Sequence, residues 1–367
     1  MKKILLTAAL LCACVGASAQ YKYEFTDVKV NAATPVKNQA STGTCWCFAT
    51  VSFLESELLR MGKGEYDLSE MFIVRNNYIR RMNDNYLRRG RGNVSQGSIA
   101  HMNIWVMDNV GLMPEEVYDG INYDSATHNH GELAKWVKTV SDAAVEMKTP
   151  LKPEIVNGVL DAYLGQVPET FTYKGKEYTA KSFAESLGLK AEDYVELTSF
   201  SHHPFYELVP VEIPDNWDHA MMYNLPLDEL MQVIDHAVNT GYTVTWDGDV
   251  SEPGYAFQHY VAVNTDEDLR KAKELTAKAV EKPVTQESRQ KGFENFTTTD
   301  DHLEHLVGIA KDQDGVKYYK IKNSWGTQRN GTGYHYFSEE YMKAKTVSIL
   351  VHKNSIPKAT KAKLGIK

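Results

Sequence analysis

The stretch QASTGTCWCFAT, residues 39–50, decides how this chain of 367 residues is interpreted. It places two cysteines, Cys45 and Cys47, beside a tryptophan at the start of a segment whose apolar residues recur at helical spacing. The small polar loop STGT comes directly before Cys45, and such loops commonly precede a helix. The pattern predicts that Cys45 lies at a helix N-terminus, where backbone amides and the helix dipole lower the pKa of a thiol.

The two cysteines are expected to have different roles. At 3.6 residues per turn, Cys47 lies about 200° around the helix axis from Cys45, so its side chain packs against the core. The spacing C-x-C differs from the C-x-x-C of thiol oxidoreductases, and the stretch does not supply four zinc ligands. A disulfide between residues two apart in a helix would be strained. Cys45 is therefore predicted to be a nucleophile and Cys47 a packing residue.

Composition indicates an ordinary globular protein, with 43% hydrophobic and 24% charged residues. The formal net charge of −8 argues against a nucleic-acid partner. No apolar run beyond the first residues is long enough to span a membrane. Further along the chain, residues 45–82 and 131–147 have helical patterns, and the charged, alanine-rich stretch 266–290 is expected to form an exposed helix.

The first residues have the pattern of an export signal. Lys2 and Lys3 precede the apolar run ILLTAALLCACVGA, and ASA at 17–19 fits a cleavage site. We expect cleavage after Ala19 and export to the periplasm or the exterior, with lipoprotein anchoring at Cys14 as the alternative.

A thiolate nucleophile needs a base, a residue that orients the base, and donors for the oxyanion. Residues 300–310 and 316–323 read as two strands joined by the turn signal DQDG. The resulting hairpin would bring His302 and Asn323 side by side, with one imidazole nitrogen on the asparagine and the other facing Cys45.

Two further residues complete this hypothesis. Gln39, on the loop before the helix, could point its amide at the same place as the backbone N–H of Cys45. His305 is the competing base, but three residues past His302 on a strand it faces the opposite side of the sheet.

These blocks resemble the active-site blocks of papain-like cysteine peptidases. The family pattern Q-x5-C-W, then H-x5-G, then N-S-W-G is present in this order. The resemblance implies that Cys45 is the nucleophile, His302 the base and later the acid, Asn323 the residue that orients the imidazole, and Gln39 an oxyanion donor.

The resemblance also assigns supporting residues and shows departures from papain. Trp325 would shield the hydrogen bond of the base from water, and Trp46 would support the site. Ala40 and Thr42 stand where the family has a glycine and a disulfide-forming cysteine. His302 lies 257 residues after the nucleophile, whereas about 130 to 150 is usual, so the chain carries insertions.

One segment places the chain within the family. MYNLPLDELMQVIDHAVNTGYTVTWDGDV, residues 222–250, resembles a block of the bleomycin hydrolase and aminopeptidase C branch. The implied fold is α+β and papain-like, with a helical lobe, a β-barrel-like lobe and insertions. After a signal peptide at 1–19, residues 20–367 would form the peptidase domain: a helical lobe at about 40–215 including an insertion at 122–215, a β lobe at about 21–39 and 216–353, and a C-terminal arm at 354–367.

Substrate-binding residues are assigned by the same resemblance. The segment that begins GNVSQGS at residue 92 is similar to the family loop that lines a substrate pocket. The candidates are Val94, Ser95, Gln96, Gly97, Ser98 and, next to the base, Asp301. Neither a metal nor a cofactor is expected, because the pairs His128/His130 and His202/His203 are not part of a carboxylate-containing metal motif.

The predicted activity is thiol-dependent hydrolysis of peptides through an acyl-enzyme. Resemblance to the aminopeptidase C branch implies removal of N-terminal residues, a C-terminal arm that fills part of the cleft, and a hexameric homo-oligomer. The alternatives are a papain-like endopeptidase and, at lower rank, a non-catalytic papain-fold binding protein.

Overall fold

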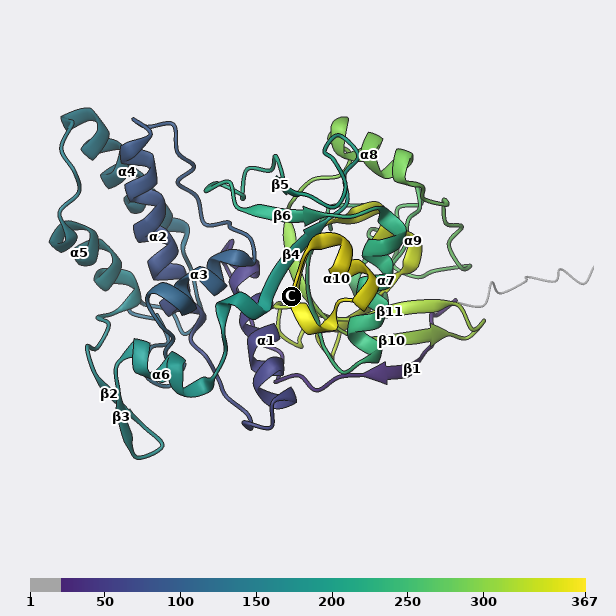
Figure 1. The fold of residues 1–367 in the computed structure, drawn as a ribbon, viewed down its shortest axis with the longest axis horizontal. Helices are drawn as coiled ribbons and strands as arrows, with labels where there is room; N and C mark the ends of the chain where they lie inside the picture. The colour runs from purple at the N-terminus through teal and green to yellow at the C-terminus, as the bar shows by residue number, and fades with distance from the viewer. Residues whose placement is uncertain (1–20) are drawn as a thin grey trace, which may run out of the picture.

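The computed structural model describes residues 21–367. The predicted signal segment at 1–19 and the candidate lipidation residue Cys14 lie outside the described residues. The described chain has a helical lobe and a lobe built on a large mixed sheet, with α1 between them (Figure 1). No helix of residues 21–367 has both the length and the apolar character needed to cross a bilayer.

The helical lobe is built around the first two helices. The predicted helical stretch 45–82 is in fact two helices, because the chain turns at Gly62 and Gly64, which both have positive φ. Ser69 then caps the second helix by accepting from the Phe72 N–H. The elements of this lobe are α1 (Cys45–Arg60), α2 (Glu70–Leu87), α3 (His101–Asn109), α4 (Gly131–Met147), α5 (Pro153–Leu164), β2 (Phe171–Tyr173), β3 (Lys176–Tyr178) and α6 (Ala180–Leu187).

The second lobe has an eleven-stranded sheet in the order β5-β6-β4-β13-β7-β10-β11-β12-β9-β8, with β1 paired to β10. Its strands are β1 (Phe25–Val30), β4 (Tyr194–Thr198), β5 (Leu208–Pro210), β6 (Met221–Asn224), β7 (Val244–Gly248), β8 (Tyr255–Ala256), β9 (Val261–Ala262), β10 (His302–Asp312), β11 (Lys317–Lys322), β12 (Tyr334–Ser338) and β13 (Thr346–His352). The helices of this lobe are α7 (Leu227–Asn239), α8 (Gln286–Glu294), α9 (Glu339–Lys345) and α10 (Lys358–Leu364).

The α+β fold class is confirmed, with one difference in detail. The strand order of the described residues is open, so the sheet is not a closed barrel. Strands β4 and β5 lie in the stretch 122–215, which the sequence assigned to the helical lobe, yet they pair with β13 and β6. The stretch 266–290 also differs from its prediction, because helix begins there only at Gln286.

Strand alternation on β10 separates two cores. Leu303 belongs to the core cluster of the helical lobe, whereas Leu306 belongs to the cluster that includes residues of α7, α9 and α10. His305 is fully buried on the side of α1, where its Nδ1 lies 2.8 Å from the Ser52 hydroxyl. It therefore connects α1 to the sheet.

A polar contact also joins α3 to β4. The Nε2 of His101 lies 2.8 Å from Asp218, and its Nδ1 lies 3.5 Å from Glu196. Burial disfavours the charged ring, but hydrogen bonds and charges from these two carboxylates outweigh it and raise the pKa of His101 to about 9.

This contact predicts how stability depends on pH. A raised pKa means that the protonated imidazole stabilises the fold fully below pH 6.5 and that this contribution is lost as the pH rises to about 9. Relative to His101→Gln, the wild-type protein is expected to lose about 1 to 3 kcal/mol of unfolding free energy between pH 6 and pH 9. Urea unfolding at the two pH values measures this, and equal losses in both proteins would contradict the prediction.

Candidate active site

The structure places the two cysteines in different environments, as predicted. Cys45 is the first residue of α1 and is partly exposed. Cys47 is completely buried, and its Sγ donates to the carbonyl oxygen of Glu70 at 3.3 Å. Both are free cysteines. Cys45 is thus the cysteine that a substrate can reach.

The predicted lowering of the Cys45 pKa is wrong for the protein as described. Burial raises the pKa of the Cys45 thiol to about 12, even though hydrogen bonds with the backbones of Leu303 and Trp46 act in the opposite direction. The negative charges of Asp300 and Asp215 add to the increase. Desolvation and nearby carboxylates therefore outweigh the helix N-terminus, and the thiol is protonated at neutral pH.

The hairpin of β10 and β11 brings the predicted base and its partner together. His302 opens β10 and Asn323 follows β11, two strands that pair antiparallel. The Nε2 of His302 lies 3.0 Å from the Oδ1 of Asn323, and both residues are buried. The Trp325 ring stacks on the imidazole with centroids 4.8 Å apart, which places it over this hydrogen bond.

Hydrogen bonding determines the orientation of the Asn323 amide. Its Nδ2 donates to the Tyr255 hydroxyl at 2.9 Å, and its Oδ1 accepts from the Ser324 N–H at 2.7 Å. The Oδ1 is therefore an acceptor, so the Nε2 of His302 must carry a proton in order to donate to it. In the neutral imidazole this leaves Nδ1 as the basic nitrogen.

Three buried residues behind Asn323 were missed in the sequence. The Tyr255 hydroxyl donates to Glu304 at 2.9 Å, and the other oxygen of Glu304 lies 2.5 Å from the Nε2 of His335. Glu304 is also 3.9 Å from the Nε2 of His302. The available signal was an acidic residue near the start of a strand whose centre is apolar, since a buried carboxylate needs partners.

Gln39 is held close to the hairpin. Its N–H donates to the Ser324 carbonyl at 2.9 Å, and its Oε1 accepts from the Ser324 hydroxyl at 2.6 Å. Its Nε2 donates one hydrogen to the Thr42 carbonyl at 2.7 Å, which leaves the second hydrogen for another acceptor. Ala40 has φ +51°, a left-handed conformation that explains the glycine usual at this position in the family.

The segment THNH, residues 127–130, supports the loop that leads to Cys45. The Ser41 N–H donates to the His128 carbonyl at 3.1 Å, and the His130 N–H donates to the Ser41 carbonyl at 3.2 Å. Both histidines are buried, and burial lowers the pKa of His130 to about 4. They stabilise the loop and are not a solvated pair.

The loop at 94–98 lies against the nucleophile helix. Gln96 accepts from the Trp46 indole through its carbonyl at 2.9 Å and from the Gly43 N–H through its Oε1 at 2.8 Å. A Cβ on Gly97 would collide with the Asp215 carboxylate, so this position requires glycine. Of the other candidates, Val94 and Ser95 are half-buried, whereas Ser98 is buried beneath Trp217.

Asp301 contacts backbone rather than the cleft. Its two oxygens accept from the N–H groups of Val250 and Ser251 at 2.8 and 3.2 Å. The acidic residues that influence the thiol are Asp300 and Asp215, which were not among the predicted site residues. The signal for the first was the pair of acidic residues directly before His302.

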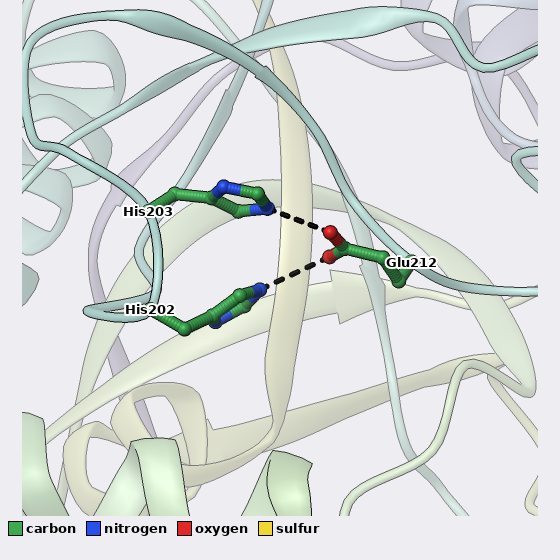
Figure 2. A group of neighbouring side chains, drawn as sticks. All are labelled: His202, His203 and Glu212. Atoms are coloured by element: carbon green, nitrogen blue, oxygen red, sulfur yellow. Dashed lines mark hydrogen bonds and ion pairs between the residues drawn. The ribbon is translucent and has the colours of Figure 1, made fainter.

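His202, His203 and Glu212 lie together on the surface (Figure 2). Each imidazole Nε2 lies within hydrogen-bonding distance of a different oxygen of Glu212, at 3.0 and 2.8 Å. The ligand types suit a metal ion such as zinc, but all three potential ligand atoms already have partners. Glu212 could not be paired with these histidines from the sequence because it lies nine and ten residues further on, after β5.

Comparisons with known proteins agree with this architecture. The family model described as Peptidase C1-like family matches residues 95–366, which is more than half of the chain. Aminopeptidase C of Lactococcus lactis subsp. cremoris is 23% identical over 87% of this chain and 81% of its own length. Aminopeptidase G of Lactobacillus delbrueckii subsp. lactis is 22% identical over 88% and 82%. The fold is similar to the crystal structure of PepW from Lactobacillus rhamnosis, with a TM-score of 0.68 at 17% identity over 93% of this chain and 84% of PepW.

The expected export to the periplasm or the exterior is corrected by these comparisons. The chain is similar to aminopeptidases C and G and to PepW, and this similarity contradicts both secretion and anchoring at Cys14. The sequence pattern at 1–19 was the only basis for the expected export.

The family match, the relatives of similar length and the shared fold lead to one conclusion. The chain belongs to the Peptidase C1-like family and is a cysteine peptidase of its papain-like aminopeptidase C branch.

Proposed function

We propose that this peptidase cleaves its substrates with Cys45 as nucleophile, His302 as base and Asn323 as the residue that orients the base. The main support for this proposal is the orientation of the Asn323 amide. It makes the Nε2 of His302 a donor and leaves Nδ1 free to accept the thiol proton.

The reaction follows from this arrangement. His302 Nδ1 takes the Cys45 proton, and the thiolate attacks the substrate carbonyl carbon. The oxyanion accepts from the Cys45 N–H and from the second hydrogen of Gln39 Nε2. The imidazolium then protonates the leaving amine as the C–N bond breaks, which leaves a thioester. His302 deprotonates water, which hydrolyses the thioester and releases the thiol.

We further propose that the enzyme removes residues from the N-terminus of peptides. The support is the similarity to aminopeptidases C and G. The arm at 354–367 has its hydrogen bonds on the α7 side: Lys363 bonds Glu229 and Tyr206, and Ser355 accepts from His236. None of the hydrogen bonds found for 354–367 within the described chain reaches Cys45 or His302, so the predicted arm mechanism has no support in these contacts.

Product analysis tests the proposal. Unblocked peptides of eight to ten residues (a range chosen for mass spectrometry) are digested with and without prior alkylation by iodoacetamide. We expect stepwise loss of N-terminal residues that alkylation abolishes. Internal fragments as first products would show an endopeptidase, and turnover that survives complete alkylation of Cys45 would contradict the thiol mechanism.

The network behind Asn323 gives a further prediction. Tyr255→Phe removes the acceptor of the Asn323 amide and a donor to Glu304, so the asparagine is held less firmly. We expect kcat to fall about 10-fold with KM changed by less than about twofold, as for other residues that orient catalytic groups. Tyr260→Phe serves as control, because this tyrosine donates to the Asn330 carbonyl instead. Equal kcat for Tyr255→Phe and wild type would contradict the role of the network.

A further inference from the structure

Two carboxyl groups close to Cys45, the buried Asp247 and the half-buried Asp300, have no cationic partner within the described chain. Asp247 on β7 is only 1% exposed; its Oδ2 accepts from the Ser348 hydroxyl at 2.9 Å, and its Oδ1 is unpartnered. The Oδ2 of Asp300 is also buried without a partner. The two carboxyls are near enough to hydrogen-bond to one another when one is protonated. A pair of this kind is costly when both groups are charged, unless a proton or a cation compensates it.

The neighbouring acids are compensated by the protein itself. Asp215 lies 3.6 Å from the buried Arg81, and Glu196 lies 3.5 Å from His101. By contrast, no ion pair within residues 21–367 involves Asp247 or Asp300. A proton on Asp247 leaves one negative charge on the pair, and a cationic substrate can neutralise it.

A pocket of about 580 Å³ is lined in part by Asp300. Its walls are mainly apolar, from Ile213, Pro214, Phe293 and Phe296. The other lining carboxylates have partners: Glu212 is hydrogen-bonded with His202 (Figure 2), and Glu294 accepts from Gln290. This leaves Asp300 as the lining carboxyl that can meet a charged group. Apolar walls with one such carboxyl suit an amino-terminal residue with an apolar side chain.

The carboxyls are also close to the reacting sulfur. Asp247 is directly opposite Leu303 in the pairing of β7 with β10, and the Leu303 backbone hydrogen-bonds the Cys45 thiol. The charge of Asp300 raises the pKa of that thiol. A positive charge bound at the two carboxyls would therefore reach the nucleophile as well.

We propose that Asp300, with Asp247 hydrogen-bonded behind it, binds the free α-ammonium group of a peptide substrate. This subsite rests on the proposed peptidase function and supplies its preference for unblocked N-termini. The substrate cation neutralises Asp300, whose charge adds to the effect of burial on the Cys45 thiol, so transfer of the thiol proton to His302 becomes easier once an unblocked peptide is bound. An N-acylated peptide loses both the ion pair and this activation.

Asp300→Asn at pH 8 tests the subsite, with leucyl-7-amino-4-methylcoumarin and its N-acetyl derivative as substrates. We expect kcat/KM for the free amine to fall about 30-fold or more, with the acetylated substrate changed by less than about threefold. Iodoacetamide should alkylate Cys45 faster in the variant, because one negative charge beside the thiol is gone. Asp266→Asn, an exposed charge removal, is the control for both measurements.

The outcomes separate this inference from the proposed function. A free-amine to acetylated ratio equal to wild type, or alkylation that is no faster, overturns the subsite while Cys45 stays essential. Turnover of both substrates by Cys45→Ala overturns the peptidase mechanism itself. If Asp300→Asn fails to fold, inhibition of the wild-type enzyme decides: leucinamide must bind at least about tenfold more tightly than N-acetyl-leucinamide, and equal binding overturns the subsite.

Discussion

Cys45→Ser is expected to lower kcat by about 10⁴-fold or more, since removing one member of a nucleophile–base pair eliminates most of the chemical catalysis. Serine preserves the size and the position at the start of α1. However, its hydroxyl is far less acidic than a thiol, and the substitution leaves folding and substrate binding in place. The effect is measured as the rate at which an unblocked peptide is hydrolysed, divided by the concentration of folded protein.

The chain contains a matched control for this variant two residues away. Cys47→Ala removes a buried thiol whose only hydrogen bond goes to the Glu70 carbonyl, so it should cost about 1 kcal/mol of stability and leave kcat within about twofold. Of the two cysteines in residues 21–367, iodoacetamide should label only Cys45 in the native protein, because Cys47 is completely buried. Loss of activity in both variants, or in neither, would contradict the assignment of the nucleophile.

His302→Ala is the second substitution with a large expected effect. Without the imidazole, the Cys45 proton has no acceptor, and the raised pKa leaves very little thiolate at neutral pH. We expect kcat to fall about 10³- to 10⁵-fold. Activity should reappear in part as the pH rises from 8 toward 10, because the thiol then ionises without a base, whereas the wild-type enzyme shows no comparable gain.

The competing histidine provides the control. His305 faces α1, where it contacts the Ser52 hydroxyl and the Phe53 ring. Loss of a buried polar contact usually costs about 1 to 2 kcal/mol, so His305→Gln should lower the thermal midpoint of unfolding by several degrees. The kcat of the folded variant should be nearly unchanged. A variant of His305 that folds normally but has lost its activity would reverse the two assignments.

Local patterns predicted the elements whose signals lie within a few residues. The helix expected at 131–147 is α4, and the hairpin of β10 and β11 brings His302 to Asn323 as its turn signal indicated. The helix expected at 266–290 failed because alanine-rich charge patterns say little about packing. That stretch instead makes tertiary contacts, such as Leu275 and Ala279 in a small core cluster.

The pKa of Cys45 shows where sequence reasoning stops. A helix N-terminus can be recognised from a loop and an apolar periodicity, so the lowering contribution was visible. The opposing contributions come from burial and from Asp215 and Asp300, which lie 170 and 255 residues away in the chain. Such distances can be bridged only by the fold, and the same is true of the Tyr255, Glu304 and His335 network.

The segment 127–130 makes catalysis dependent on a distant part of the chain. Its main-chain bonds to Ser41 hold the turn between Gln39 and Cys45. The oxyanion donors therefore keep their positions only while this segment is docked, which couples enzymatic competence to its attachment. A protease cut or a destabilising substitution at 127–130 would then silence the enzyme while the sheet lobe stays folded, and turnover itself would report how completely this segment is docked.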